Sequence, residues 1–185
     1  DNAAVKQLCE RSVFMNETIQ TILTRRSIRS FKEQPIAKED LDLMIQAALP
    51  APSGMGLQTW QFTGITNPEK IQSLAKAISS VLNRSGYDMY RPAALIIPSN
   101  QKDSHFGKED DACALENIFL AAHSLGIGPV WINQLQGICD EPAVRAILKE
   151  FRIPDDHIVY GMAALGYAAA APSEKERIGK VVFIQ

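Results

Sequence analysis

Apolar residues recur along this chain in two patterns, one typical of helices and one typical of strands. Apolar positions three and four residues apart predict amphipathic helices at 5–14, 16–26, 38–49, 67–82, 108–125 and 140–148. Short runs of β-branched and apolar residues predict strands at 60–66, 93–97, 130–133, 157–165 and 180–184. Helices and strands interleave throughout, so we expect α and β elements around one sheet. The pattern leaves open whether the strands pair in parallel or antiparallel.

Several predicted helices carry residues that favour a sharp start or stop. Asn16 can cap the helix that follows it, and Asn67 before Pro68 is typical of a helix start. Gly126 is placed to end the longest helix. No stretch is rich enough in Gly, Ser or Pro to divide the chain. We therefore expect a single domain over 16–185, preceded by an N-terminal extension over 1–15.

The composition is that of an ordinary globular protein. The 185 residues are 46% hydrophobic and 22% charged, with a net charge of −2, so we expect a buried core and no nucleic-acid or membrane partner. No apolar run approaches the roughly 20 residues that span a bilayer, and the N-terminus lacks the apolar stretch of a signal peptide. Three widely spaced cysteines cannot form a disulfide framework, which favours a reducing, cytoplasmic setting.

The first candidate binding segment is Arg-Arg-Ser-Ile-Arg-Ser-Phe at 25–31, where the second predicted helix ends. Forked guanidinium donors and short hydroxyls suit a phosphate group. The alternative is a solvated basic helix end that complements the helix dipole. Ile28 and Phe31 favour binding, because apolar side chains indicate a segment packed against the protein.

The second candidate is the loop Ala-Pro-Ser-Gly-Met-Gly-Leu-Gln-Thr-Trp at 51–60. Its glycines permit close backbone approach to a flat ligand, and Ser53 and Gln58 can hydrogen-bond. The alternative is an ordinary connection between a helix and a strand.

Other charged residues give weaker signals. Lys175 and Arg177 are either solvated charges or, if they lie near the first segment, the completion of a dianion site. Asp110, Asp111 and Glu116 are interpreted as helix-start and surface charges. The three histidines are scattered without ligand spacing, so no metal is expected.

Taken together and in this order, the segments resemble the FMN-dependent nitroreductase family from about residue 18 to residue 182. Besides the motifs at 25–31 and 51–60, Asp-Ala-Cys-Ala-Leu-Glu-Asn-Ile-Phe-Leu-Ala-Ala at 111–122 resembles the family's long central helix. Leu-Gly-Ile-Gly-Pro-Val-Trp-Ile at 125–132, Leu-Gly-Tyr at 165–167 and the basic pair near the C-terminus also fit. The resemblance implies an α+β fold, with a central, mostly antiparallel sheet flanked by helices, in an intertwined homodimer.

The resemblance also implies site residues, with two FMN molecules held in clefts between the subunits. One group would meet the FMN phosphate: Arg25, Arg26, Ser27, Lys175 and Arg177. Arg29 would approach the pyrimidine edge of the flavin. The partner subunit would cover the ring with Pro52, Ser53, Gly54 and Gly56. Further contacts are expected from Gln58, Asn83, Val130, Trp131, Ile132 and Asn133.

The implied function is reduction of nitroaromatic, quinone or related small electrophilic acceptors, with NADH or NADPH as electron donor. We expect a ping-pong cycle: the donor passes a hydride to flavin N5 and leaves, and the acceptor then binds in its place. Because the chemistry belongs to the flavin, no catalytic side chain is expected, and Arg29 would favour the reduced, anionic ring. Two alternatives stay open. One is an FMN-binding relative with different chemistry (dehalogenation, heterocycle oxidation or flavin fragmentation), and the other is a non-catalytic module that binds a phosphorylated ligand.

Two positions depart from the family's usual pattern. Gly56 stands where the family usually has Asn, and Thr59 stands where it usually has Pro. Loss of the Asn amide removes a side-chain contact with the flavin. We therefore expect an effect on cofactor affinity or substrate preference rather than on the fold.

Overall fold

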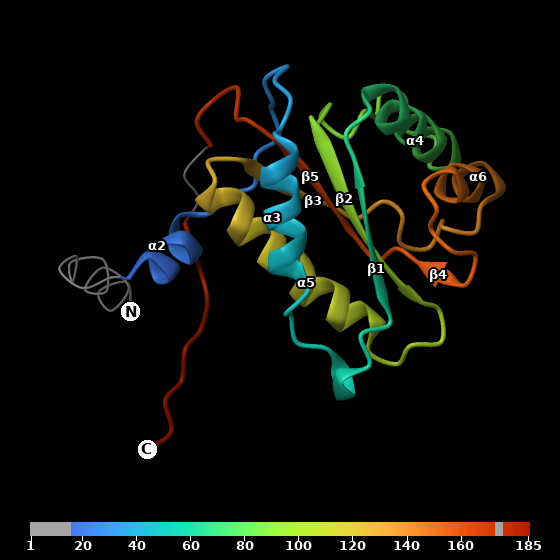
Figure 1. Cartoon of the computed structure of the whole chain (residues 1–185). Helices are drawn as coiled ribbons and strands as arrows, with labels where there is room; N and C mark the ends of the chain where they lie inside the picture. The colour runs from blue at the N-terminus through green and yellow to red at the C-terminus, as the bar shows by residue number, and fades with distance from the viewer. Residues whose placement is uncertain (1–15, 173–175) are drawn as a thin grey trace.

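The computed structural model describes residues 16–172 and 176–185 (Figure 1). Its helices are α2 (Glu17–Thr24), α3 (Lys38–Ala48), α4 (Pro68–Val81), α5 (Gly107–Ser124), α6 (Pro142–Glu150) and the short 3-10 helix η1 (Gly54–Gly56). Its strands are β1 (Trp60–Ile65), β2 (Ala94–Gln101), β3 (Gly128–Ile132), β4 (His157–Ile158) and β5 (Met162–Gly166). The helix predicted at 5–14 lies outside the described residues.

The five strands form one sheet in the order β1-β2-β5-β3, with β4 paired to the far end of β2. Every pairing between named strands is antiparallel. The α+β class and the antiparallel sheet are therefore confirmed. Helices α3 and α5 cover one face of the sheet and α4 and α6 cover the other (Figure 1). Because both faces are covered, β2 and β5 are buried almost throughout.

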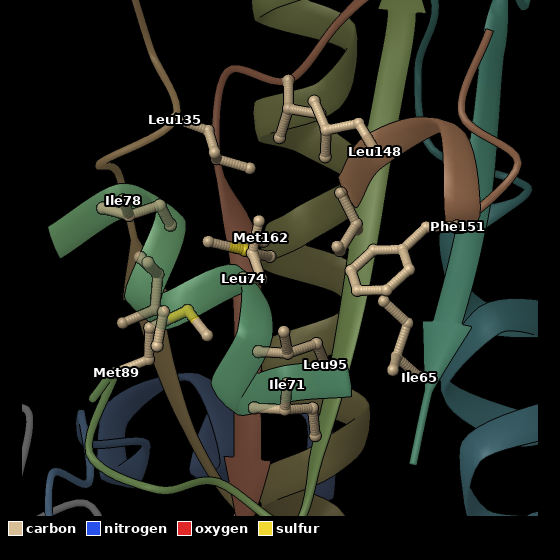
Figure 2. Packing of buried hydrophobic residues seen from close by; sticks show 14 of the residues in the cluster. Ile65, Ile71, Leu74, Ile78, Met89, Leu95, Leu135, Leu148, Phe151 and Met162 are labelled. Carbon is tan, nitrogen blue, oxygen red and sulfur yellow. The ribbon is translucent and has the colours of Figure 1, made fainter. Parts of the chain in front are cut away.

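Two cores, one on each face, share the central strands. Alternate residues of β2 point to opposite sides, so Leu95 packs in the core under α4 and α6, whereas Ile96 packs in the core under α3 and α5. Figure 2 shows the first core, where Ile71 and Leu74 of α4 pack over Leu95 and Met162. Burying each such side chain contributes roughly 1.5–3 kcal/mol to stability.

The predicted helix caps are present. Asn16 Oδ1 accepts a hydrogen bond from Ile19 N at 3.0 Å, and Asn67 Oδ1 accepts one from Lys70 N at 2.9 Å. Gly126 adopts the left-handed conformation, with φ +74°, just after α5. One helix differs from the others, because α2 has an apolar stripe but no buried residue. Its apolar side chains are about half exposed: Ile19, Ile22 and Leu23.

Two strand predictions are wrong. The strand predicted at 157–165 is divided into β4 and β5, because Val159 N donates to Cys139 Sγ at 3.3 Å and Cys139 Sγ lies 3.6 Å from Val159 O. The backbone at Val159 is therefore paired with a side chain rather than with the sheet. The segment 180–184 is exposed and without regular structure, because it lies beside no neighbouring strand within the described chain.

Candidate functional site

The arginine segment, residues 25–31, is held against the sheet by its backbone. Ile28 N donates to Pro129 O at 3.0 Å, and Ser30 O accepts from Ala169 N at 2.9 Å. Ile28 is buried and Phe31 half-buried, whereas Ser27 and Arg29 are exposed. The apolar residues therefore hold the segment against the protein, as their positions in the sequence predicted, and the polar side chains face outward.

Arg25 has a donor without an acceptor. Its Nε atom is buried and lies 3.5 Å from Glu116 Oε1, within ion-pair distance but too far for a good hydrogen bond. Among the described residues this Nε has no hydrogen-bond partner. Burial, reinforced by the charges of Arg25 and Arg26, lowers the pKa of His123, whose Nε2 lies 2.8 Å from Thr24 Oγ1. A positive potential and an unpartnered buried donor at one place suit an anion.

Arg26 behaves differently from Arg25. Its Nη1 donates to Leu23 O at 2.8 Å and to Arg25 O at 2.9 Å. These carbonyls belong to the end of α2, so Arg26 partly fills the role of a basic residue that complements a helix terminus.

The second candidate, the loop at 51–60, is built on the first turn of α5. Ser53 Oγ donates to Asp110 Oδ2 and Gly54 N donates to Asp110 Oδ1, both at 2.8 Å. Thr59 Oγ1 donates a hydrogen bond to Asn100 Oδ1 at 2.6 Å. A proline at position 59 could not make this hydrogen bond. Pro52, Gly56 and Gln58 are exposed.

The two candidate segments contact different parts of α5 (Figure 1). The loop is bonded to Asp110 near the start of α5, and Thr24 at the end of α2 meets His123 near its end. Along α5, Arg25 reaches Glu116 six residues after Asp110 and Thr24 meets His123 thirteen residues after it, which correspond to about 9 and 20 Å of helix. The structure therefore does not bring the loop and the arginine segment together within one chain.

The expected contacts on β3 divide into backbone and side-chain groups. Val130 and Ile132 are buried in the core under α4 and α6, so only their backbone could face a ligand. Trp131 is 38% exposed, packs edge-on against Phe119 with ring centroids 5.9 Å apart, and its Nε1 lies 3.3 Å from Asn133 Oδ1. Asn133 is exposed at the end of the strand.

The structure does not join the other expected residues to either segment. Asn83 is exposed after α4, on the opposite sheet face from α5. Arg177 is exposed in the irregular C-terminal segment, and Lys175 lies outside the described residues. A hollow of about 490 Å³ lies between 32–35, the start of α4 and 91–93, and none of the expected cofactor residues lines it.

The interpretation of Asp110 and Asp111 as surface charges is wrong. Both are buried, and Asp111 Oδ1 accepts from Asn100 Nδ2 at 2.9 Å while its Oδ2 has no partner among the described residues. Burial raises the pKa of Asp111 to about 7, against the opposing effect of the Asn100 hydrogen bond. Helical spacing could have revealed this position, because Asp111 is three and four residues before the buried Ala114 and Leu115.

The described ranges, 16–172 and 176–185, contain neither a cluster of metal-ligating side chains nor a helix that could span a membrane. No three His, Cys, Asp or Glu side chains there are grouped so that they could hold a metal ion. No helix there is both long enough and apolar enough to cross a membrane.

Comparison with known proteins places these features in a family. The family model described as Nitroreductase family matches residues 22–167. An NADPH-flavin oxidoreductase from Vibrio harveyi is 31% identical over 175 residues, covering 89% of this chain and 71% of that protein. An FMN reductase (NADPH) from Bacillus subtilis is 27% identical over 186 residues, covering 90% and 72%. A nitroreductase with bound FMN from Bacteroides fragilis superposes with a TM-score of 0.86 at 37% identity, covering 92% and 100%. This chain therefore belongs to the nitroreductase family.

Proposed function

We propose that this protein is an FMN-dependent oxidoreductase that takes electrons from NADH or NADPH and passes them to nitroaromatic, quinone or related small electrophilic acceptors. The observation that carries the proposal is the arginine segment of a nitroreductase-family chain, with a buried Arg25 Nε that lacks an acceptor. The names of the relatives from Vibrio harveyi and Bacillus subtilis support a flavin and a nicotinamide donor.

The residues present fit the phosphate of FMN. Arg25 offers the unpartnered donor, and Ser27 and Arg29 add an exposed hydroxyl and guanidinium in the same segment. A dianionic phosphate at this place would accept hydrogen bonds from the arginine guanidinium groups and the Ser27 hydroxyl and offset the local positive charge. Arg29 lies two residues beyond Ser27 and would reach the pyrimidine edge of the ring.

When bound, FMN would supply the redox chemistry itself, by accepting a hydride at N5 from NAD(P)H and returning two electrons to the acceptor in a ping-pong cycle. The chain's own residues bind and orient the ring. A guanidinium near its pyrimidine edge stabilises negative charge there, which is the role proposed for Arg29. The backbone of 130–133 would line the opposite edge, since the side chains of Val130 and Ile132 pack in the core under α4 and α6 and are not available to a ligand.

We also propose that the complete site forms between two copies of the chain, each a single domain over 16–185. The attachment of the loop and of the arginine segment to different parts of α5 supports this, because no hydrogen bond or ion pair among the described residues joins the two within one chain. The unburied apolar stripe of α2 and the exposed C-terminal side chains of Val181, Phe183 and Ile184 favour burial against a second copy. Lys175 and Arg177, which precede these side chains in the sequence, are proposed to complete the phosphate site.

The visible spectrum of the purified protein, before and after anaerobic NADH or NADPH, tests the function. Flavin bands that bleach with either nucleotide, followed by reoxidation with a quinone, are the expected result. If neither nucleotide bleaches the flavin bands, the alternative that this protein binds FMN but carries out different flavin chemistry would be favoured. A protein that takes up no FMN on reconstitution would overturn the proposal and favour a phosphate-binding module without catalysis.

A further inference from the structure

The loop between α3 and β1 has an uncommon backbone. Met55, Gly56 and Gln58 have φ values of 55°, 68° and 50°, in the left-handed region. For the two residues with side chains, this conformation costs of the order of 1 kcal/mol or more each. Met55 is also 85% exposed, so packing of its own side chain does not stabilise the loop. Other contacts must therefore hold the loop in this shape.

A buried carboxylate supplies those contacts. Asp110 is only 3% exposed, and both of its oxygens are used by the loop: Oδ2 accepts from Ser53 Oγ, and Oδ1 accepts from Gly54 N. Ser53 Oγ in turn accepts from Gln58 N at 2.9 Å. A chain of hydrogen bonds thus runs from one carboxylate to both ends of the strained stretch. Hydrogen bonds to an ionised, buried acceptor are among the stronger ones in proteins.

An aromatic ring closes the other side of the loop. A Cβ added at Gly54 would lie 2.2 Å from Phe106 Cγ, so only glycine fits between this ring and Asp110. Phe106 precedes the first residue of α5 and Asp110 lies in its first turn. The loop is therefore fixed to an 18-residue helix rather than to another loop, which gives a binding surface a rigid support.

The role of Ser53 follows from the same geometry. Its hydroxyl hydrogen is donated to Asp110 and its oxygen also accepts from Gln58 N, so it is not free to donate to a ligand. Ser53 acts on a bound ring through the shape of the loop. The groups that would meet the ring are then the exposed backbone and apolar atoms of Pro52, Met55 and Gly56.

We propose that Asp110 is a positioning residue, which sets the flavin environment and the acceptor pocket by holding the loop at 53–58 in its left-handed shape. This inference rests on the proposed function, because it assigns the loop to a flavin. Asp110 itself does not touch the ring. Its replacement should change how the ring is held while leaving the arginine segment intact, because that segment contacts α5 at Glu116 through Arg25 and shares no hydrogen bond with the loop.

The test compares Asp110→Asn with Ser53→Ala and with the matched control Glu109→Gln, which removes the same charge from the neighbouring exposed position. The introduced amide can accept only one of the two hydrogen bonds, so we expect FMN to bind about tenfold more weakly. We also expect a changed visible circular dichroism band of the bound flavin and a higher KM for a quinone acceptor. Ser53→Ala should change the FMN affinity, the circular dichroism band and the KM in the same direction but by smaller amounts. Glu109→Gln should match the wild type in all three.

The outcomes separate this inference from the function on which it rests. A wild-type protein that binds no FMN overturns the proposed function, whatever the variants do. Wild-type FMN binding, with Asp110→Asn lowering only the melting temperature and leaving the flavin spectrum, affinity and KM unchanged, overturns the positioning role. If Asp110→Asn does not fold, Ser53→Ala decides, and an unaltered flavin signal in that variant contradicts the inference.

Discussion

Gly128 and Ile28 are packed so closely that a Cβ added at Gly128 would lie 2.5 Å from Ile28 Cγ1. The next residue along, Pro129, accepts the hydrogen bond from Ile28 N. The start of β3 and the centre of the arginine segment can therefore pack this closely only because residue 128 has no side chain. Because Arg25, Ser27 and Arg29 flank Ile28, the position of the proposed phosphate site depends on this contact.

Gly128→Ala should displace the arginine segment. The new Cβ cannot be accommodated unless Ile28 moves, and such overpacking typically lowers the free energy of unfolding by about 1–3 kcal/mol. We expect FMN retention to fall with it, measured as flavin per chain after gel filtration. Gly64→Ala is the control, because the nearest atom there, Ile45 Cδ1, lies at 3.7 Å. Restored retention in Ile28→Ala/Gly128→Ala would confirm that the clash is the cause, and full retention in Gly128→Ala alone would contradict it.

Replacing Arg25 and Ser27 together by alanine should abolish most FMN retention. The change removes the unpartnered guanidinium donor and a hydroxyl from the proposed phosphate site, and each lost charge-assisted hydrogen bond is worth roughly 1.5–3 kcal/mol. The measurement is the dissociation constant from flavin fluorescence. Lys76→Ala, on the exposed face of α4, serves as a control for loss of positive charge. Unchanged flavin content in the double variant would exclude this segment as the phosphate site.

The sequence correctly predicted the helix ends that depend on contacts between residues close together in the chain. Asn16, Asn67 and Gly126 determine helix ends by contacts within a few residues, and those ends were predicted. The break at Val159 depends on Cys139, twenty residues away, and no local pattern reports such a contact. The segment 180–184 has strand-like residues but no neighbouring strand in the described chain.

The same distinction applies to the candidate site. The residue types at 25–31 indicated ligand binding and those at 51–60 were compatible with it or with an ordinary connection, and the resemblance supplied FMN. The separation of these segments along α5 and the burial of Asp110 are properties of the tertiary structure. Asp110 was misinterpreted because an acidic residue in a first helical turn is usually exposed and needs no partner beyond the helix dipole.

Gly56→Asn should strengthen FMN binding. Gly56 has φ +68°, and a Cβ added there meets nothing within 4 Å. Asn tolerates the left-handed conformation better than most residues, and it would restore the amide that the family usually has here. We expect a several-fold lower dissociation constant for FMN with little change in melting temperature. Gly56→Ala controls for the backbone effect, since it adds a Cβ without the amide; equal affinity in the two variants would contradict a role for the amide.

Asp111 should make stability depend on pH. Its pKa is raised to about 7 in the folded protein, whereas an unfolded Asp titrates near 4. Between these values the folded state holds a proton that the unfolded state has released. The contribution of Asp111 to the free energy of unfolding is therefore fully present below about pH 4 and is lost as pH rises through 7. Its upper limit is about 4 kcal/mol.

Asp111→Asn should remove that contribution, because the amide oxygen can still accept from Asn100 and carries no charge at any pH. Urea unfolding at pH 5 and pH 8 checks this. The variant should gain stability relative to the wild type at pH 8 and much less at pH 5. Glu109→Gln, at an exposed position of the same helical turn, should show no such difference. A wild type and an Asp111→Asn variant with parallel pH profiles would contradict the raised pKa.

Mixed dimers can test whether the site is shared between chains. One parent carries Arg25→Ala/Ser27→Ala, which removes the phosphate donors, and the other carries Gly54→Val, which drives a side chain into Phe106 and disrupts the loop. Each parent homodimer should retain little FMN. If the loop of one chain completes the site at the arginine segment of the other, a mixed dimer purified through two affinity tags should contain one intact shared site and bind one FMN. If each site were built from a single chain, the mixed dimer would have no intact site and would retain no more flavin than its parents. A wild-type protein that is monomeric with FMN bound would contradict the shared site directly.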